Sequence, residues 1–231
     1  MEAVKNKMIP LLALTITKVI EFNCSSSRKA MILVQITGTL RNLANVEQCH
    51  PQLAHSAIGK LCDIFFDNQF NQGKELSLNI ARLLSKVSLD YKCAEKIVQS
   101  GHIKGYLKAM VQHRESSAIL IRLAYILGNL TTNFEEARVR LTEQSSTEKS
   151  CFVIITELAC FYLEKDADPE KSAQGEERKD VKNAKYQEFT TGHLEDALTK
   201  IIKLLANLST EETKAYSEFH EKKDLYEGFI K

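Results

Sequence analysis

The stretch Leu40-Arg41-Asn42-Leu43-Ala44 is one copy of a short helical phrase that recurs along this chain of 231 residues. The other copies are Leu127-Gly128-Asn129-Leu130-Thr131, Leu205-Ala206-Asn207-Leu208-Ser209 and the degenerate Leu84-Ser85-Lys86-Val87-Ser88. In chain order, the third residues of the four copies lie 44, 43 and 78 residues apart. The last interval equals one period of about 43 plus an insertion of about 35 residues, so the phrase predicts a helical repeat.

A unit of this size cannot bury its apolar faces alone, so neighbouring units stack and leave one long concave surface. We therefore predict an all-α, right-handed solenoid of about four to five units. Residues 1–231 should form a single repeat domain. Its units are expected at 1–45, 46–89, 90–132 and 133–210, the last with a charged insertion at 165–191, followed by a partial unit or cap at 211–231.

Helical periodicity predicts one long helix at the end of each unit. The long helices are expected over Met31–Asn45, Lys74–Leu89, Ser117–Thr131 and His193–Ser209. Shorter helices are expected over Glu47–Ala54, Ile58–Phe66, Tyr91–Gln99, Ile103–Gln112 and Cys151–Leu163, and a first helix opens near Ile9. The long helices are apolar on more than one side, as is typical of the innermost helix of a stacked unit.

The insertion at 165–191 mixes charges of both signs and has almost no apolar residue. Burial there cannot offset the entropy lost on ordering the chain, so we expect a surface loop.

Composition narrows the function further. The net charge of +1 disfavours a dedicated nucleic-acid binder. The six cysteines are scattered without a C-x-x-C pair, which favours reduced thiols in the cytoplasm. The apolar stretch near Ile9 is too short to span a membrane. Cys49, His50 and His55 lack a repeated ligand spacing, so we expect no metal, and no cofactor or catalytic motif appears.

The order of short helix, glycine turn, second helix and long helix ending in Asn-Leu resembles the armadillo repeat family. The resemblance covers about residues 30–210 and is carried by the stretches Val34–Ala44, Asn79–Leu89 and Ile126–Thr131. These stretches are similar to members linked to cilia and flagella, which support delivery and assembly of axonemal parts such as radial spokes. The resemblance implies a non-enzymatic adaptor in the cytoplasm and the ciliary or flagellar axoneme, with axonemal or ciliary transport components among its partners.

In armadillo grooves the asparagine of the third helix faces the concave side and bonds the backbone of an extended peptide, because an amide offers both a donor and an acceptor. The resemblance assigns this role to Asn42, Asn129 and Asn207, with Lys86 in place of the second asparagine. The alternative is that these side chains hold loops at the helix ends.

Residues four and seven positions before this column lie on the same side of each helix. They are Gln35 and Gly38, Asn79 and Arg82, Arg122 and Tyr125, and Lys200 and Lys203. We call these eight residues and the four column residues the Asn-column face. Five of its twelve positions are Lys or Arg and none is acidic, which predicts an extended acidic protein segment as the partner. The alternative is an ordinary solvated helix face.

Three other functions remain open at this stage. A general cytoplasmic regulator with this fold could bind acidic motifs without a ciliary role. An RNA-binding helical repeat would read one base per unit, but such arrays favour shorter periods and a more basic surface. An enzyme assembled from distant residues is the least favoured. Binding of nuclear-import cargo is disfavoured, because nuclear-import armadillo proteins hold basic signals with Trp-Asn pairs and this chain has no tryptophan.

Overall fold

The computed structural model describes residues 7–70, 73–143, 149–167 and 191–210, and the secondary structure of these residues is helical throughout. The chain divides into two compact units, residues 1–105 and residues 106–231, which we describe separately. The single repeat domain over 1–231 stays a prediction.

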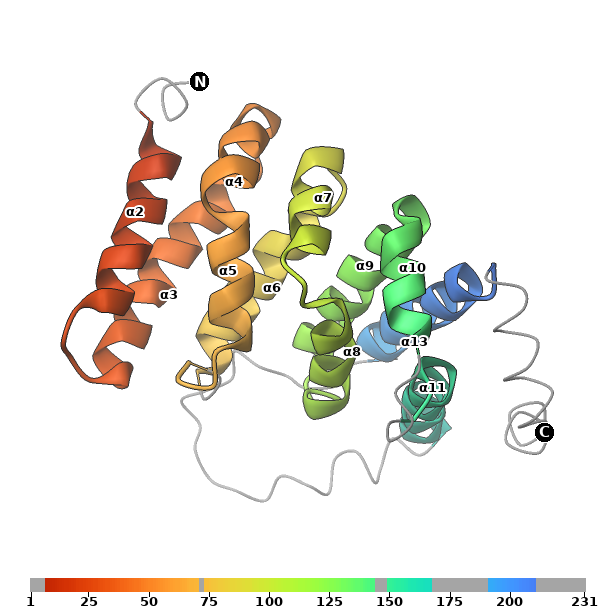
Figure 1. Ribbon diagram of the computed structural model, residues 1–231. Helices are drawn as coiled ribbons and strands as arrows, with labels where there is room; N and C mark the ends of the chain where they lie inside the picture. The colour runs from red at the N-terminus through yellow and green to blue at the C-terminus, as the bar shows by residue number, and fades with distance from the viewer. Residues whose placement is uncertain (1–6, 71–72, 144–148, 168–190, 211–231) are drawn as a thin grey trace, which may run out of the picture. The chain divides into compact units, whose positions relative to one another are not determined.

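Unit 1 contains α3 (Ser26–Leu43) and α6 (Lys74–Val87), the helices that end in copies of the recurrent phrase, together with other helices (Figure 1). They are α2 (Met8–Glu21), α3 (Ser26–Leu43), the 3-10 helix η1 (Glu47–Cys49), α4 (His50–Ser56), α5 (Ile58–Phe66), α6 (Lys74–Val87) and α7 (Tyr91–Gln99). The next helix, α8 (Ile103–Gln112), begins in unit 1 and ends in unit 2. The long helix α3 packs on α6, while α4 packs on α2 and α7, and α5 packs on α6 and α7. The helices α3 and α6, which end in copies of the recurrent phrase, thus pack on each other, and the short helix α4 packs on the short helix α7, as expected for stacked repeat units.

Unit 2 contains α9 (Ser117–Asn133), α10 (Glu135–Thr142), α11 (Cys151–Ala167) and α13 (Thr191–Leu208). The long helices α9 and α13 pack on each other, α11 packs on α13, and α10 contacts both α9 and α13. The phrases that end α9 and α13 therefore belong to helices that lie side by side, although 78 residues separate them.

The helix bounds confirm most of the sequence prediction. The structure gives α5, α7 and α8 the predicted bounds. It adds α10, which the sequence analysis did not predict, and it starts α3 at Ser26, where the Ser25 hydroxyl accepts a hydrogen bond from the Arg28 N–H at 3.4 Å.

The predicted insertion begins too early, because α11 continues to Ala167 and so includes its first three residues. Lys165 is held on this last turn by the Glu115 carboxylate at 2.7 Å and by the Phe161 ring, whose centroid lies 4.9 Å from the ammonium. Residues 168–190 of the insertion and the predicted cap at 211–231 lie outside the described residues.

The turn between α7 and α8 depends on Gly101, whose φ of 81° lies in the left-handed region that favours glycine. This glycine follows the end of α7 and lets the chain reverse into α8, between the two helices that the sequence predicts at Tyr91–Gln99 and Ile103–Gln112.

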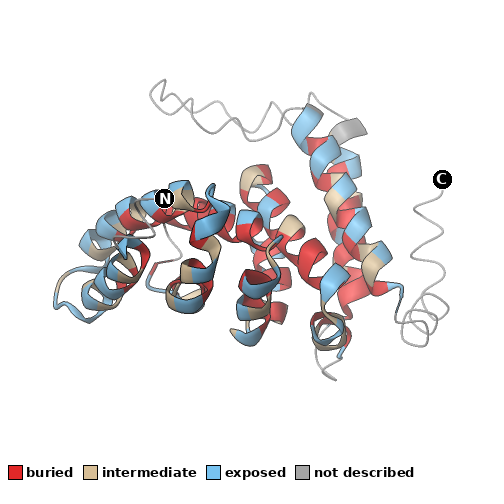
Figure 2. Cartoon of the chain, turned by 90° about the horizontal axis from the view of Figure 1, so that it is seen from above, coloured by how far each residue is buried: buried red, intermediate tan, exposed pale blue. Residues whose placement is uncertain are grey.

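The long helices differ in how much they bury. Ten of the 14 residues of α6 and 12 of the 17 residues of α9 are buried, but only four of the 18 residues of α3 are. In Figure 2 the helices next to the N-terminus are accordingly mostly pale blue and tan, whereas red is frequent farther along the chain. The apolar core of unit 1 is therefore thinnest at its first layer.

Two further findings concern membrane-spanning helices and metal-binding clusters. None of the described helices combines the length and the apolarity needed to cross a membrane. In the described part of the chain, no three His, Cys, Asp or Glu side chains lie close enough together to hold a metal ion. His50 instead places Nε2 3.1 Å from the Ala44 carbonyl oxygen.

Candidate protein-binding surface

In unit 1, the Asn-column face is formed by α3 and α6. Gln35 and Asn42 on α3, and Arg82 and Lys86 on α6, are exposed. Gly38 is half-buried and leaves room for the neighbouring helix, since a Cβ atom on it would lie 3.8 Å from the Asn79 amide nitrogen. The predicted residues of unit 1 therefore sit on two adjacent helices, and most of them reach solvent.

Asn79 is the exception in unit 1, because it is only 6% exposed. Its Oδ1 accepts a hydrogen bond from Arg41 Nη1 at 2.6 Å, and its Nδ2 donates to the Val34 carbonyl oxygen at 3.4 Å. Both ends of the amide are thus used to join α6 to α3. This is the bonding of an interhelical tie rather than of an amide presented to a peptide.

Two cations on or beside this face in unit 1 are bonded to neutral amides. Arg41 reaches Asn79 and, at 3.5 Å, the Asn42 side-chain oxygen, and Lys86 donates to the Asn45 side-chain oxygen. An amide oxygen accepts a hydrogen bond but carries no net charge, so it leaves the positive charge uncompensated. The sequence analysis missed both Arg41 and Asn45, which lie one residue before and three residues after the asparagine of the first phrase.

In unit 2, the same face is formed by α9 and α13. Arg122 and Lys203 are exposed, whereas Tyr125 and Lys200 are half-buried. Among the described residues, no carboxylate pairs with Arg122 or with Lys203. These two side chains are the least compensated cations of the predicted set.

Lys200 has two partners within unit 2. Its ammonium lies 5.2 Å from the centroid of the Tyr125 ring, a cation–π distance, and 3.7 Å from the Asp196 carboxylate. Asp196 precedes Lys200 by one helical turn and lies just outside the twelve positions, where helical spacing could have revealed it. The charge at Lys200 is therefore partly compensated at one end of the face.

The asparagines of unit 2 are also engaged by the fold. Asn207 Nδ2 is 2.9 Å from the Gly128 carbonyl oxygen and 3.0 and 2.9 Å from the hydroxyl oxygens of Thr131 and Thr132. Asn129 is 8% exposed, and its backbone carbonyl accepts a hydrogen bond from Asn133 at 3.1 Å. The Asn207 bonds tie α13 to α9, much as Asn79 ties α6 to α3.

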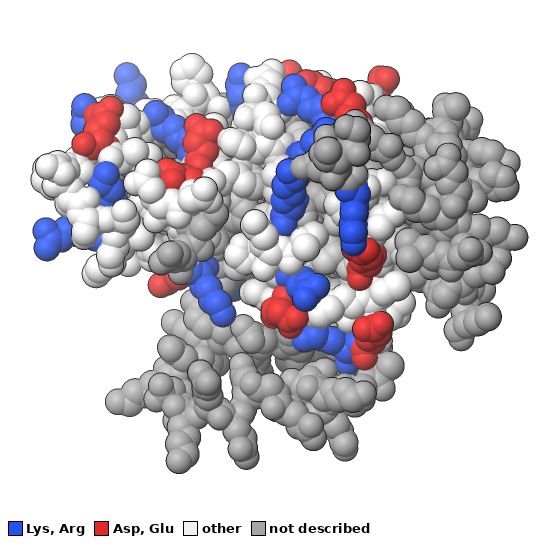
Figure 3. Space-filling model, turned by 60° about the horizontal axis from the view of Figure 1, so that its bottom comes forward, with Lys and Arg blue, Asp and Glu red and all other residues white. Residues whose placement is uncertain are grey.

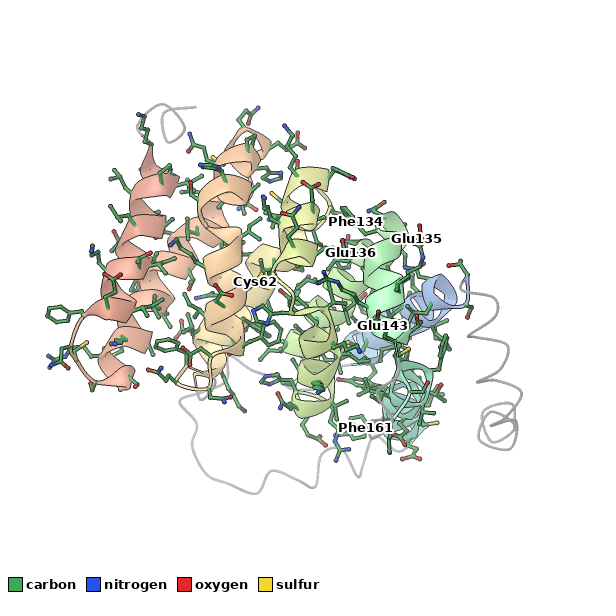
Figure 4. All side chains as sticks on the ribbon, in the orientation of Figure 1. Cys62, Phe134, Glu135, Glu136, Glu143 and Phe161 are labelled. Carbon is green, nitrogen blue, oxygen red and sulfur yellow. The ribbon has the colours of Figure 1, made fainter. Side chains whose placement is uncertain are left out.

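Unit 2 also carries acidic residues outside the twelve positions, for example at the two ends of α10. Glu135 and Glu136 begin α10, and Glu143 follows its last residue (Figure 4). Figure 3 likewise shows Asp and Glu side chains among Lys and Arg over one face of the molecule. The absence of acids is thus a property of the twelve positions and not of the whole surface.

The titratable groups with shifted pKa values lie away from this face. Asp90 caps α7 by accepting a hydrogen bond from the Cys93 N–H at 3.0 Å, and its carboxylate is 3.7 Å from His50 Nδ1. Burial alone would raise the pKa of Asp90, but the bonds from Cys93 and the nearby His50 hold it below its usual value. Burial and the Asp90 charge raise the pKa of the Cys93 thiol to about 12. This arrangement stabilises a helix end and offers no activated nucleophile.

Comparison with known proteins supports the repeat assignment. The chain is 28% identical over 181 residues to "Armadillo repeat-containing protein 2" of Bos taurus. It is 27% identical to the proteins of that name from Mus musculus and Homo sapiens, over 180 and 182 residues. Each match covers 77% of this chain, but the chain spans only 19–20% of the length of these relatives.

No family model matches the chain, and no solved structure matches it significantly. The helical layers, the recurrent phrase and the three relatives nevertheless agree. The chain has an all-α armadillo-repeat fold, and its sequence is similar to that of armadillo repeat-containing protein 2.

Proposed function

We propose that this protein is a non-enzymatic scaffold whose Asn-column face binds an extended, acidic protein segment. The observation that supports the proposal is the charge of that face: five of its twelve positions are Lys or Arg, and none is Asp or Glu. Four of the five cations are exposed. A surface of one sign attracts a partner of the opposite sign and raises its rate of association.

The exposed cations, rather than the asparagines, carry most of this proposed binding. Asn79 and Asn207 already donate to backbone carbonyls of neighbouring helices. Arg122 and Lys203 in unit 2 are exposed and can turn toward a carboxylate without giving up a bond within the described residues. Arg82 and Lys86 in unit 1 are also exposed, and Lys86 would exchange its bond to the neutral Asn45 amide for one to a carboxylate. The proposed mode is therefore charge recognition on each unit, supported by the half-buried Tyr125 in unit 2.

The cellular setting in the proposal rests on similarity. The relatives are named for their armadillo repeats, and the resemblance to members linked to cilia and flagella suggests a role in assembly or transport of axonemal components such as radial spokes. We accordingly propose a cytoplasmic protein that also works at the axoneme. Tagging the protein in ciliated cells and fractionating their axonemes tests this part: its absence from axonemes and from transport particles would contradict the ciliary role.

The binding part is tested with a fluorescent peptide of alternating Glu and Gly. Anisotropy should show binding to the protein that weakens as salt is raised, because exposed charges are screened over about 8 Å at physiological ionic strength. Replacing Arg82, Arg122 and Lys203 together by Glu should reduce the affinity at least about tenfold, equivalent to about 1.4 kcal/mol.

A matched variant controls for the change in net charge. Lys92, Lys108 and Lys149 are also exposed and lie outside the face, so replacing these three by Glu changes the charge equally. This variant should keep most of the affinity, and circular dichroism should show both variants to be as helical as the parent. Equal losses in the two variants would mean that net charge, and not this face, attracts the peptide.

A further inference from the structure

The helices α6, α9 and α13 bury the same row of side chains, and the equivalent row on α3 is mostly exposed. Relative to the Asn column, the row occupies the positions ten and three residues before it and one residue after it. We call this row the stacking row. It consists of Leu76, Leu83 and Val87 on α6, Ile119, Ile126 and Leu130 on α9, and Ala197, Leu204 and Leu208 on α13. All nine side chains are at most 2% exposed.

On α3 the equivalent residues are Ile32, Thr39 and Leu43. Ile32 is 40% exposed, Thr39 is exposed and Leu43 is half-buried. The α3 helix packs with its other side, through Leu33, Ile36, Thr37 and Leu40. The row that is buried on three long helices is therefore open to solvent on the first one.

The role of this row can be followed on α6, where it runs beside a residue that bonds to α3. Asn79 lies between Leu76 and Leu83 in the row, and it donates to the Val34 carbonyl oxygen of α3. The residue of α3 equivalent to Asn79 is Gln35, which also carries an amide and is exposed. On α3, Ile32 is followed three residues later by the amide of Gln35, just as on α6 Leu76 is followed three residues later by the amide of Asn79.

Other apolar side chains of α2 and α3 are also exposed. Leu11 and Leu14 on α2 are 59% and 55% exposed, and Met31 at the start of α3 is 69% exposed. The α2 and α3 helices pack on each other, so these side chains belong to one layer. Exposed apolar residues gathered on one layer are typical of an interaction surface, whereas the terminal layer of a repeat array normally has a polar outer face.

We propose that the outward face of α2 and α3 is a docking surface for a further armadillo-type layer, whose long helix packs on α3 as α3 packs on α6. In that arrangement Ile32 and Leu43 become buried, and Gln35 donates to a backbone carbonyl of the added helix. The occupant is identified by continuity with the interface between α3 and α6, since the same row and the same amide position are used. The relatives are about four times as long as this chain, which is long enough to carry such layers.

The test adds an idealised armadillo unit of designed sequence ahead of residue 1 of the full chain, joined by a flexible Gly-Ser linker. The stability of a repeat protein is approximately the sum of its units and their interfaces, so a stacked unit stabilises its neighbour. We expect the melting temperature of the chain to rise by about 5 °C or more. Failure of the N-terminal unit to raise the melting temperature would overturn the proposal.

Two variants locate the effect. Ile32→Glu should abolish the rise while leaving the melting temperature of the chain without the added unit nearly unchanged, because Ile32 is already partly exposed. Leu89→Glu, at a residue that is 65% exposed and outside the face, should leave the rise intact. A rise that survives Ile32→Glu would contradict packing on α3.

Sedimentation of the unmodified chain separates this occupant from a second copy of the protein. With a further layer as the occupant, the chain alone should keep a monomer mass over a range of concentrations. A dimer that forms with concentration and is lost on Ile32→Glu would assign the face to a second copy and overturn the proposed layer.

Discussion

The helices α3 and α6 are built alike and packed differently. They end in copies of the same phrase 44 residues apart, and they pack on each other, yet α6 buries ten of 14 residues and α3 four of 18. Each buried side chain needs atoms on the facing surface, and a larger share of α6 than of α3 is covered in this way. The phrase therefore predicts that a helix forms and which residues can be buried, while the neighbouring layers decide how many of them are.

The largest predicted effect is a difference between two equivalent residues of these helices. Leu76→Ala should lower the free energy of unfolding by about 2–5 kcal/mol, because Leu76 is 1% exposed and its loss leaves a cavity. Ile32→Ala, at the same position of α3, should cost about 1 kcal/mol or less. Urea denaturation followed by circular dichroism measures both. Similar losses for the two variants would mean that Ile32 is also covered in the isolated chain.

A second and smaller difference is expected for the amides. Asn79→Ala removes the partner of both Arg41 and the Val34 carbonyl, so it should cost about 1–3 kcal/mol. Gln35→Ala removes an exposed side chain and should change stability by about 0.5 kcal/mol or less. The same urea experiment compares them. A small effect at Asn79 would show that the interhelical tie is not important for holding α6 on α3.

The smallest predicted effect concerns how the stability that the Asp90 cap contributes depends on pH. The helix α3 begins with the neutral cap Ser25, whereas α7 begins with Asp90, whose pKa is below its usual value. A depressed pKa adds stability above the unfolded value of about 3.9, and this stability is lost as the pH falls through the folded value. Asp90→Asn keeps a capping side chain without the charge, so the parent should be more stable at pH 7 by about 0.3–1 kcal/mol.

That advantage should shrink as the pH falls below about 4, because Asp90 becomes protonated first in the unfolded chain and then, at a lower pH, in the folded protein as well. Unfolding of the parent and of Asp90→Asn by urea at several pH values measures the difference. Ser25→Ala, as the control, should lower stability by a constant amount across the same range. A difference between the parent and Asp90→Asn that did not depend on pH would contradict the role of the Asp90 charge.

Helical periodicity was enough to predict most of the fold. The structure gives α5, α7 and α8 their predicted bounds, because each has a clear apolar stripe and a break at both ends. The helix α10 was missed because Glu135, Glu136, Arg138 and Arg140 hide the pattern. Only Ala137, Leu141 and Thr142 of this helix are buried, and its place depends on contacts with α9 and α13.

The candidate site could be predicted less completely. Helix geometry identified positions that share a side of each helix, and Arg82, Lys86, Arg122 and Lys203 are indeed exposed. Residue spacing along one helix does not reveal which residues of the next helix it contacts. Asn79 bonds to residues 38 and 45 positions away in the sequence, and Asn207 bonds to a residue 79 positions away. The burial of these asparagines follows from the stacking of layers, which a single sequence does not specify side chain by side chain.

The junction of α4 and α7 has a consequence for thiol chemistry. With a pKa of about 12, only about one Cys93 thiol in 100,000 is ionised at pH 7. Its sulfur is also fully buried and lies 3.4 Å from the His50 carbonyl oxygen. Iodoacetamide should therefore spare Cys93 in the folded protein and reach it only when α7 separates from α4, whereas the half-buried Cys24 should react sooner. The rate at which iodoacetamide labels Cys93 therefore measures how often α7 separates from α4.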